Sequence, residues 1–377
     1  MAIPSAIQCG AAHCSKCSDV SVSFDVATLA DEAEVRRLLR ENPIGGRYAM
    51  STEREPNGLA GTGLPEERTT TILARDDKTG AAIGLCQRIV RPAYVDGERR
   101  MLPYLGALRI AASHRHRINI LKGGFGAVHH HGARPDELAW ALTSIASDDA
   151  RSRRILTAGL AGLPRYEPIC GYVTFVFLPR RRRLADGIVS AVDADLIDVA
   201  EFLQRTLSRH QCTPVWSQAA LRVIGAENLL VSRANGEITG CVGVWDQSAF
   251  KQTVARGYPT AISIMRPLLN VLAPLVGNPQ LPAVGAPLRL VYLSAFAIKA
   301  DQADGLRPLL GAALDLAAMR GAGAAAFGLD ARHPWVTAVR RTFAAIEYRT
   351  EFYCVLEGGR RCAPGVDRLT MPDVGLL

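Results

Sequence analysis

The fold is decided by one continuous stretch of the chain, Tyr104-Leu-Gly-Ala-Leu-Arg-Ile-Ala-Ala-Ser-His-Arg-His-Arg-Ile-Asn-Ile-Leu-Lys-Gly-Gly-Phe125. Its first part, Tyr104 to Ile110, is mostly apolar and has no signal for the start of a helix, so it predicts a buried strand. From Ile118 onward, apolar residues recur at roughly helical spacing, which predicts a helix. The stretch therefore forms a strand, a basic turn from Ser113 to Arg117, and a helix.

The basic turn between this strand and this helix is suited to an anion. A helix that begins there points unpaired N–H groups and the positive end of its dipole into the turn. Such an arrangement is a natural phosphate site. Arg115, His116 and Arg117 add positive charge to it. The alternative interpretation is an ordinary strand–helix unit with a basic surface turn, and this motif alone does not decide between the two.

The same stretch resembles the central motif of the GNAT superfamily of N-acetyltransferases. There a turn of the form Arg/Gln-x-x-Gly-x-Gly/Ala holds the pyrophosphate of acetyl-CoA through its backbone amides. The corresponding residues here run Arg115-His-Arg-Ile-Asn-Ile120, so isoleucine fills both small positions. Glycine allows a close approach of backbone to phosphate, and the chain departs from the pattern there. The residues that the resemblance implies for cofactor binding are Leu108, Arg109, Ile110, Arg115, His116, Arg117, Ile118, Asn119 and Ile120.

The elements around this stretch follow the order that the superfamily uses. Alternating or β-rich segments predict strands, and segments with helical periodicity predict helices. Asp149 stands where the superfamily often has the Asn that opens its last helix. The predicted strands are 21–26, 70–75, 82–93, 102–110, 138–145 and 169–178, and the predicted helices are 31–39, the segment from 118, and 149–158.

The pattern of strands and helices is then repeated in the second part of the chain. Tyr292-Leu-Ser-Ala-Phe296 echoes Tyr104-Leu-Gly-Ala-Leu108, which indicates duplication of one α/β unit. The second copy has Asp304 in its cofactor turn, where a carboxylate would repel phosphate. We therefore expect the cofactor in the first copy.

The fold class that follows is α/β (α+β), with two tandem GNAT-like acyl-CoA N-acyltransferase domains. Each is expected to have a mixed, mostly antiparallel sheet flanked by helices. The predicted boundaries are an N-terminal tail 1–20, a first domain 21–179, a basic linker 180–187, a second domain 188–358 with an insertion 247–287, and a C-terminal tail 359–377.

Composition narrows the class of protein. The chain has 377 residues, of which 48% are hydrophobic, and a formal net charge of +8. This length suits two domains, and the apolar content supports sizeable cores. No apolar run is long enough to span a bilayer and the N-terminus lacks the features of a signal peptide, so we expect a cytoplasmic protein without a membrane partner. The positive charge is accounted for in part by a polyanionic cofactor, and no nucleic-acid module is recognised.

The catalytic groups are less clearly marked. Acyl transfer to an amine needs a neutral amine, a donor for the thioester oxygen and a proton for the leaving thiolate. The central strand offers Tyr104, and Tyr166 is the nearest phenol downstream of the place where the superfamily carries its proton donor. By the same resemblance, the long loop after the first helix supplies candidate substrate contacts, namely Arg47, Tyr48, Glu53 and Glu55.

Two clusters have residues that bind metals in other proteins. Cys9, His13, Cys14 and Cys17 could together take zinc, but they are terminal and have no partner pair, and a terminal tail is the alternative. His129-His130-His131 are consecutive and do not share a helix face, which favours the end of a helix over a metal site. We expect no metal.

The function that the resemblance implies is an acetyl-CoA-dependent N-acetyltransferase that acts by direct transfer on a small amine or a peptide N-terminus. The alternative is a non-catalytic CoA- or ligand-binding protein that retains the fold. A nucleic-acid-binding protein is the third interpretation, because of the arginine blocks. A homodimer is left open.

Overall fold

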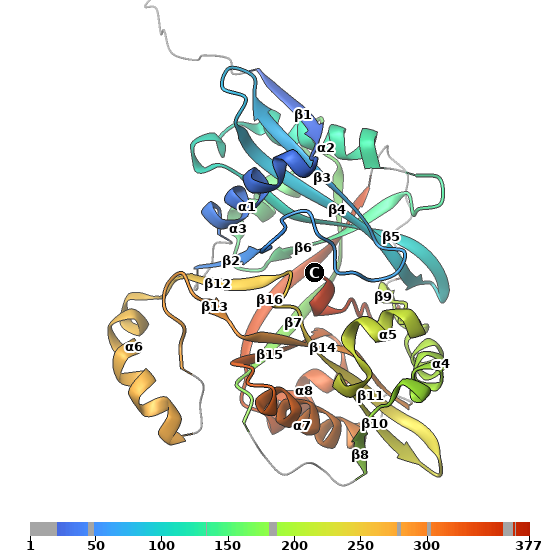
Figure 1. Ribbon diagram of the computed structural model, residues 1–377. Coiled ribbons are helices and arrows are strands. Elements are labelled where there is room, and N and C mark those ends of the chain that lie inside the picture. Colours follow the sequence, from blue (N-terminus) through green and yellow to red (C-terminus); the bar gives the residue numbers. More distant parts are fainter. Residues whose placement is uncertain are drawn as a thin grey trace, which may run out of the picture.

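The computed structural model of the chain describes residues 21–43, 49–132, 134–180, 187–276, 280–299, 303–356, 365 and 367–377. We call residues 21–180 the N-terminal half and residues 187–377 the C-terminal half. Figure 1 shows the two halves lying next to each other, with the last residues of the chain between them. Most of the described strands belong to a single 13-stranded sheet that runs through both halves.

The N-terminal half contains the elements expected from residues 21–179, together with one short strand that sequence periodicity does not predict. Its strands are β1 (Val22–Val26), β2 (Ala49–Glu53), β3 (Arg68–Asp76), β4 (Ala82–Val95), β5 (Glu98–Ile110), β6 (Trp140–Ala146) and β7 (Arg165–Phe177). Its helices are α1 (Glu32–Glu41), α2 (Ile118–Gly132) and α3 (Ala150–Leu156). Asp149 caps α3, because its carboxylate accepts a hydrogen bond from the backbone N–H of Ser152 at 2.9 Å.

The C-terminal half repeats this order with additions. Its strands are β8 (Ile188–Ser190), β9 (Thr213–Pro214), β10 (Leu229–Ala234), β11 (Glu237–Asp246), β12 (Gln252–Gly257), β13 (Pro287–Leu288), β14 (Leu290–Ile298), β15 (Ala324–Asp330) and β16 (Ile346–Leu356). Its helices are α4 (Leu196–Leu207), α5 (Gln218–Ile224), α6 (Thr260–Leu272), α7 (Ala303–Met319) and α8 (Pro334–Thr342).

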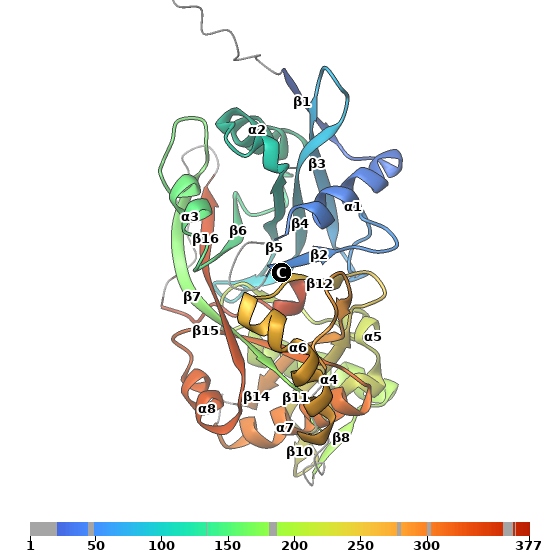
Figure 2. The same cartoon turned by 90° about the vertical axis from the view of Figure 1, so that its left-hand side faces the viewer.

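The order of the strands shows that the two halves exchange their last strands. The main path of the sheet runs β1-β3-β4-β5-β6-β16-β7-β15-β14-β11-β10-β8. Strand β16, from the C-terminal half, therefore lies between β6 and β7 of the N-terminal half, and β7 pairs in turn with β15. Figures 1 and 2 both show β7 and β16 running side by side from one half into the other. Among the described strands, the pairs β5–β6 and β14–β15 are parallel and the others are antiparallel.

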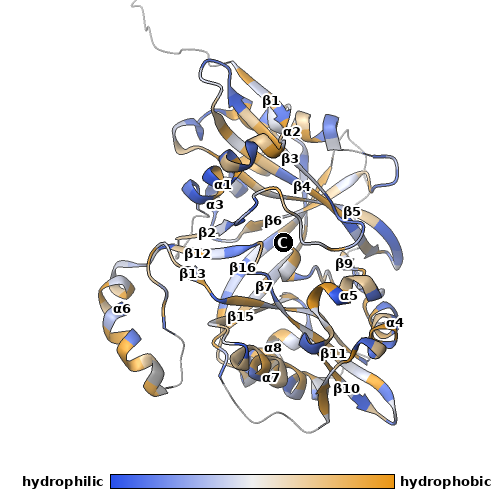
Figure 3. Cartoon of the chain, in the orientation of Figure 1, coloured by the Kyte–Doolittle hydropathy of each residue, from blue (hydrophilic) through white to orange (hydrophobic). Residues whose placement is uncertain are grey.

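The exchanged strands also contribute side chains to the hydrophobic core of the other half. Val173, Phe175 and Phe177 of β7 belong to the cluster that packs between the sheet and helices α7 and α8 of the C-terminal half. Phe352 and Cys354 of β16 pack instead with residues of β5 and β6. Figure 3 shows apolar residues along the strands of both halves. Each half thus completes the core of the other.

A second, smaller sheet joins the loop after α1 to the inserted segment after β11. Residues Ala49–Glu53 are too polar to be predicted as a strand, yet they pair with β12, with Glu53 opposite Gln252. The strand forms because a distant segment satisfies its backbone, and local periodicity does not record such a partner. The neighbouring helix α6 has no buried residue. No described helix is long and apolar enough to cross a membrane.

Because the halves share strands, we expect the protein to unfold in one cooperative transition. Phe352 has 0% exposure and packs edge-on against Tyr172 with ring centroids 5.0 Å apart. Phe352→Ala should lower the free energy of unfolding by about 3–5 kcal/mol and shift a single urea transition. Ile346→Ala, on the same strand at 53% exposure, is the control and should change the free energy by less than about 1 kcal/mol. Two separated transitions, only one of them shifted, would contradict this expectation.

Candidate functional site

The central strand of each half carries the same backbone irregularity. Ala107 in β5 has φ +53° and Ala295 in β14 has φ +51°, values that side chains other than glycine rarely adopt. The register slips at the matching place in both ladders, opposite Leu85–Gln87 in β4 and opposite Cys241–Gly243 in β11. These are β-bulges, which commonly re-aim backbone groups next to active sites. The repeated Tyr-Leu-x-Ala pattern of the sequence therefore marks the same β-bulge in both halves.

Just before each bulge, the central strand separates from its parallel neighbour. Strand β5 pairs with β6 only through Tyr104 and Leu105. Strand β14 pairs with β15 from Leu290 to Tyr292. We call the diverging segments 106–110 and 144–146 the first fork, and the diverging segments 294–298 and 328–330 the second fork. Backbone groups on the inner side of each fork are left for a ligand or for another part of the chain.

The second fork is occupied by the end of the described chain. The carboxylate of Asp373 accepts hydrogen bonds from the hydroxyl of Ser294 at 2.8 Å and from the backbone N–H of Ala295 at 3.0 Å. Burial raises the pKa of Asp373, against the lowering effect of these hydrogen bonds. The bulged backbone of the second fork thus binds a carboxylate oxygen.

The first fork has a different lining at the equivalent positions. Gly106 stands where the second fork has Ser294, and the phenol of Tyr104 reaches across to Ser144, with the two oxygens 3.0 Å apart. Burial raises the pKa of Tyr104, so the phenol stays protonated near neutral pH. Arg109 is also held in this fork. Its Nη1 donates to the carbonyl of Leu108 at 2.9 Å.

Burial lowers the pKa of Arg109, and the neighbouring charge of Arg115 lowers it further. Its Nε atom is buried and makes no hydrogen bond with any part of the chain that the structure describes. An unpaired buried N–H costs free energy unless a partner satisfies it. The first fork therefore has an unused donor as well as a positive charge.

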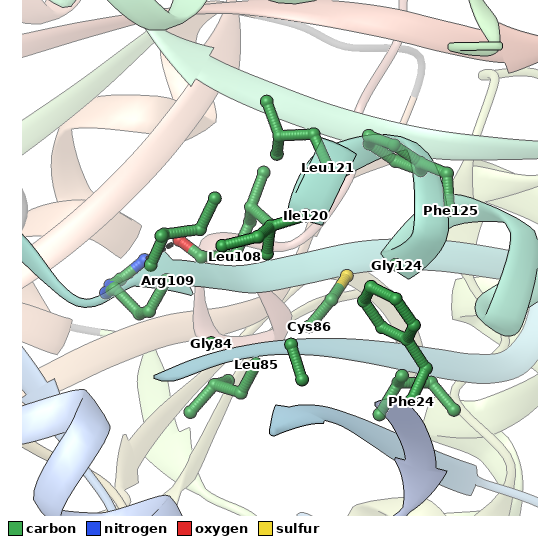
Figure 4. A pocket seen from close by; sticks show the side chains of 13 residues that line it. Phe24, Gly84, Leu85, Cys86, Leu108, Arg109, Ile120, Leu121, Gly124 and Phe125 are labelled. Atoms are coloured by element: carbon green, nitrogen blue, oxygen red, sulfur yellow. Dashed lines mark hydrogen bonds between the residues drawn. The ribbon is translucent and has the colours of Figure 1, made fainter. Parts of the chain in front are cut away.

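An apolar pocket opens beside the first fork (Figure 4). It lies between α2 and the strands β1, β3, β4 and β5, and it is narrow, with a cavity volume of about 20 Å³. Most of its lining is carbon, and Arg109 is the charged residue at its edge. Its lining includes Phe24, Ile72, Cys86, Leu108, Ile120 and Phe125.

The basic turn follows β5 directly, as the sequence indicates. A short turn of 3-10 helix, Ala112–His114, leads into the 15-residue helix α2. The guanidinium of Arg115 donates to the carbonyl of Ile110 at 3.1 Å and to the side-chain oxygen of Asn42 at 3.0 Å. Both partners are uncharged, so the positive charge of Arg115 is not neutralised by them. Arg115 and His116 are exposed at the start of α2, where the helix dipole also attracts anions.

The structure places the other predicted site residues apart from this fork or in ion pairs. Tyr166 packs edge-on against Phe125 and Tyr353, and burial raises its pKa. Glu53 is buried and pairs with Arg256. The carboxylate of Glu55 pairs with Arg36 at 2.7 Å and with Arg40 at 2.5 Å. Arg47 and Tyr48 lie outside the described residues.

Of the two candidate metal clusters, the histidine cluster lies among the residues that the structure describes. The cysteine cluster at the N-terminus lies outside the described residues. His129, His130 and His131 form the last turn of α2, and no group of potential ligands suited to a metal occurs among the residues that are described.

Sequence reasoning missed a buried group of charges at the junction of the halves. Lys251 donates to the backbone oxygens of Gly375 and Leu377 at 3.2 and 2.8 Å. Arg91 of β4 donates to the backbone oxygen of Leu376 at 2.5 Å and pairs with Glu67 at 3.1 Å. Arg91 lies in a predicted strand and Lys251 in a segment without a motif, and the sequence offers no local signal that these two charges come together.

Comparisons with known proteins address the fold. No protein-family model and no curated protein matches the sequence. Among solved structures, N-myristoyltransferase of Saccharomyces cerevisiae with bound myristoyl-CoA is similar, with a TM-score of 0.60 and 13% identity over 94% of this chain and 89% of that chain. A GCN5-related N-acetyltransferase from Sphaerobacter thermophilus is similar with a TM-score of 0.53 and 12% identity, over 92% and 98% of the two chains.

A third similar structure is a GCN5-related glucosamine N-acetyltransferase region of a fungal multi-domain β-N-acetylglucosaminidase. It has a TM-score of 0.54 and 13% identity, and the match covers 89% of this chain and 38% of that chain. At these identities the likeness shows the fold alone. The predicted GNAT-like fold, with a mostly antiparallel sheet flanked by helices, is confirmed.

The buried ammonium of Lys251 leads to a pH-dependent stability. Burial, together with the nearby charges of Arg54 and Arg91, lowers its pKa to about 7. The folded state then binds fewer protons than the unfolded state above pH 7, so the free energy of unfolding should rise with pH. We expect a rise of about 1–2 kcal/mol between pH 7 and 8.5, measured relative to Lys251→Met by urea denaturation.

The Lys251→Met reference corrects for other titrations, since burial also raises the pKa of several thiols, among them Cys86 to about 12, and these act in the opposite sense at higher pH. A difference between the two curves that stays constant from pH 6.5 to 8.5 would show that Lys251 keeps its charge in the folded protein.

Proposed function

We propose that this chain is a CoA-dependent N-acyltransferase that binds its acyl-CoA donor in the first fork. The observation that carries this proposal is the repeated bulge. In the second fork, the N–H of Ala295 donates to a carboxylate oxygen at 3.0 Å. Ala107 has the same backbone conformation and the same register as Ala295. Its N–H is therefore suited to the thioester oxygen, which gains negative charge when an amine attacks.

The basic turn is suited to the phosphates of the donor. Helix α2 begins at Ile118, directly after Arg115 and Arg117, and its first turn faces the end of β5. Helix N-termini with nearby arginines bind phosphate through backbone N–H groups and charge-assisted hydrogen bonds. The nine cofactor-binding residues that the sequence predicts, from Leu108 to Ile120, all lie on this strand, turn and helix start.

The reaction that we propose is direct transfer. The amine nitrogen of the acceptor attacks the thioester carbon, the C–S bond breaks, an amide forms, the amine loses a proton and the thiolate gains one. Tyr104 stays protonated because burial raises its pKa, so it is suited to donate a proton or a hydrogen bond and is a poor base. Tyr166 is the weaker candidate, because its ring packs against Phe125 and Tyr353. The acceptor remains, as the sequence suggested, a small amine or a peptide N-terminus.

The apolar pocket lies where the acyl group of the proposed donor would bind. The sequence predicts acetyl-CoA, and the apolar lining of the pocket beside the first fork is suited to a longer hydrocarbon chain if the lining side chains move apart when it binds. The pocket adjoins the bulge through Leu108 and the turn through Ile120. We therefore propose that the pocket takes an acyl chain longer than acetyl. The similar myristoyltransferase structure has myristoyl-CoA bound, which is in keeping with a longer chain.

The proposed donor site is tested by removing its charges. Arg115→Ala/Arg117→Ala should weaken binding of acetyl-CoA by about 10- to 100-fold, because charge-assisted hydrogen bonds to phosphate are lost. Binding is measured by calorimetry. The control is Arg99→Ala/Arg100→Ala, which removes the same charge from an exposed hairpin and should change affinity by less than about twofold.

Three results would count against this site. An equal loss in both double variants would indicate unspecific attraction to a basic protein. Binding that survives the loss of Arg115 and Arg117 would move the donor to the second copy. A wild-type chain that binds neither CoA nor its thioesters would remove the acyltransferase proposal.

The length of the acyl chain is tested with a series of CoA thioesters. Affinity should rise about fourfold for each methylene beyond acetyl until the pocket is filled. Gly124 lines the pocket, and a Cβ there would lie 3.8 Å from the ring of Phe24. Gly124→Leu should abolish the rise and leave the affinity for acetyl-CoA nearly unchanged. Gly126→Leu, on the same helix where an added Cβ meets nothing within 4 Å, should keep it. Equal affinity for acetyl- and hexanoyl-CoA in the wild type would favour acetyl-CoA.

A further inference from the structure

The segment Pro372–Leu377, which we call the plug segment, lies against the second fork with many hydrogen bonds. Asp373 accepts from Ser294 and from the backbone of Ala295, and it also accepts from the N–H of Gly375 at 2.9 Å. The carbonyl of Pro372 accepts from the phenol of Tyr172 at 2.5 Å. The polar groups of the plug segment are therefore satisfied by the walls of the fork.

The fit between the plug segment and the second fork is close. A Cβ on Gly375 would lie 2.8 Å from Oγ of Ser294 and 3.1 Å from Cβ of Tyr292. Glycine is therefore required for the backbone to approach the strand so closely. Ser294 has 0% exposure. The first fork has Gly106 at this position, so it lacks the hydroxyl that binds the Asp373 carboxylate in the second fork.

Both halves of the protein hold the plug segment. Arg91 of the N-terminal half donates to the carbonyl of Leu376, while Gln247 of the C-terminal half donates to that of Gly375 at 2.9 Å. Lys251 donates to the oxygens of Gly375 and Leu377. The segment thus takes the place between the halves toward which the second fork opens (Figure 1).

We propose that the second fork is a binding site for an extended peptide that carries a carboxylate, and that the plug segment of the same chain occupies it. The Asp373 carboxylate uses the bulge N–H that a donor oxygen would need, so the second fork is closed to acyl-CoA while the plug segment is in place. The chain consequently has one donor site. The two copies differ in function because one copy has an internal ligand.

The test is hydrogen–deuterium exchange on the full-length chain, a measurement that does not require CoA and therefore stands apart from the proposed function. In the wild type, amides 293–296 and 373–377 should be protected. Asp373→Ala should raise their exchange rates at least about tenfold, because two charge-assisted hydrogen bonds are lost. Asp373→Asn keeps only one acceptor oxygen, because its amide NH2 cannot accept the hydrogen bond that the second carboxylate oxygen takes, so exchange should rise by an intermediate factor of about threefold to tenfold. Amides of β4 and β5 serve as the internal reference.

A milder variant keeps the proposal testable if Asp373→Ala does not fold. Ser294→Ala removes one donor to the carboxylate and should raise exchange of the plug segment about threefold to tenfold. Labelling of Lys251 by an amine reagent should increase in both variants, since the plug segment covers its ammonium. Unchanged exchange and labelling in the folded variants would overturn the proposal. So would a wild-type chain that binds two equivalents of acyl-CoA.

Discussion

The pairing of β16 between β6 and β7 is the constraint on which the rest of the structure depends. Without β16, strand β6 would lose a neighbour along seven residues, and without β7, strand β15 would lose one along six. Loss of these strands would remove more than hydrogen bonds. Phe352 and Phe177 each fill the hydrophobic core of the half to which they do not belong in sequence. The exchange also determines where the forks lie, since β6 and β15 are held at fixed places by the exchanged strands while β5 and β14 bend away.

The two forks show how the same bulged backbone can serve two different ligands. Their bulges match in register and in the positive φ of their alanines, so the backbone offers the same N–H in each. The residues that precede the two bulged alanines differ by one hydroxymethyl group, Gly106 against Ser294. The hydroxyl of Ser294 favours a permanent carboxylate ligand, whereas the ring of Tyr104 lies against Gly106, 2.8 Å from where a Cβ on this glycine would be. The two copies of a duplicated unit can therefore come to differ in function through one substituted residue and a segment of the chain that binds to that residue.

Sequence reasoning recovered the elements whose signal is local. The strands of both copies, the helices with apolar periodicity and the N-cap at Asp149 could be predicted because each leaves a pattern within a few residues. The Tyr-Leu-x-Ala repeat pointed to the bulges, although not to their geometry. The position of β16 could not be predicted, because a strand's periodicity does not name its partner. Asp373 and Lys251 were missed for the same reason, since only the fold brings them together.

The isoleucine at the second of the two small positions of the turn has a physical explanation in the structure. Ile120 is only 4% exposed and lines the apolar pocket, so its side chain points into the protein and away from the exposed turn. A buried isoleucine at this place stabilises the start of α2 against the sheet by hydrophobic contact. A side chain in place of glycine hinders a phosphate only where it lies on the exposed side of the turn, and the side chain of Ile120 is buried. The departure from the superfamily pattern at this position therefore links the turn to the pocket, which is where we place the acyl chain.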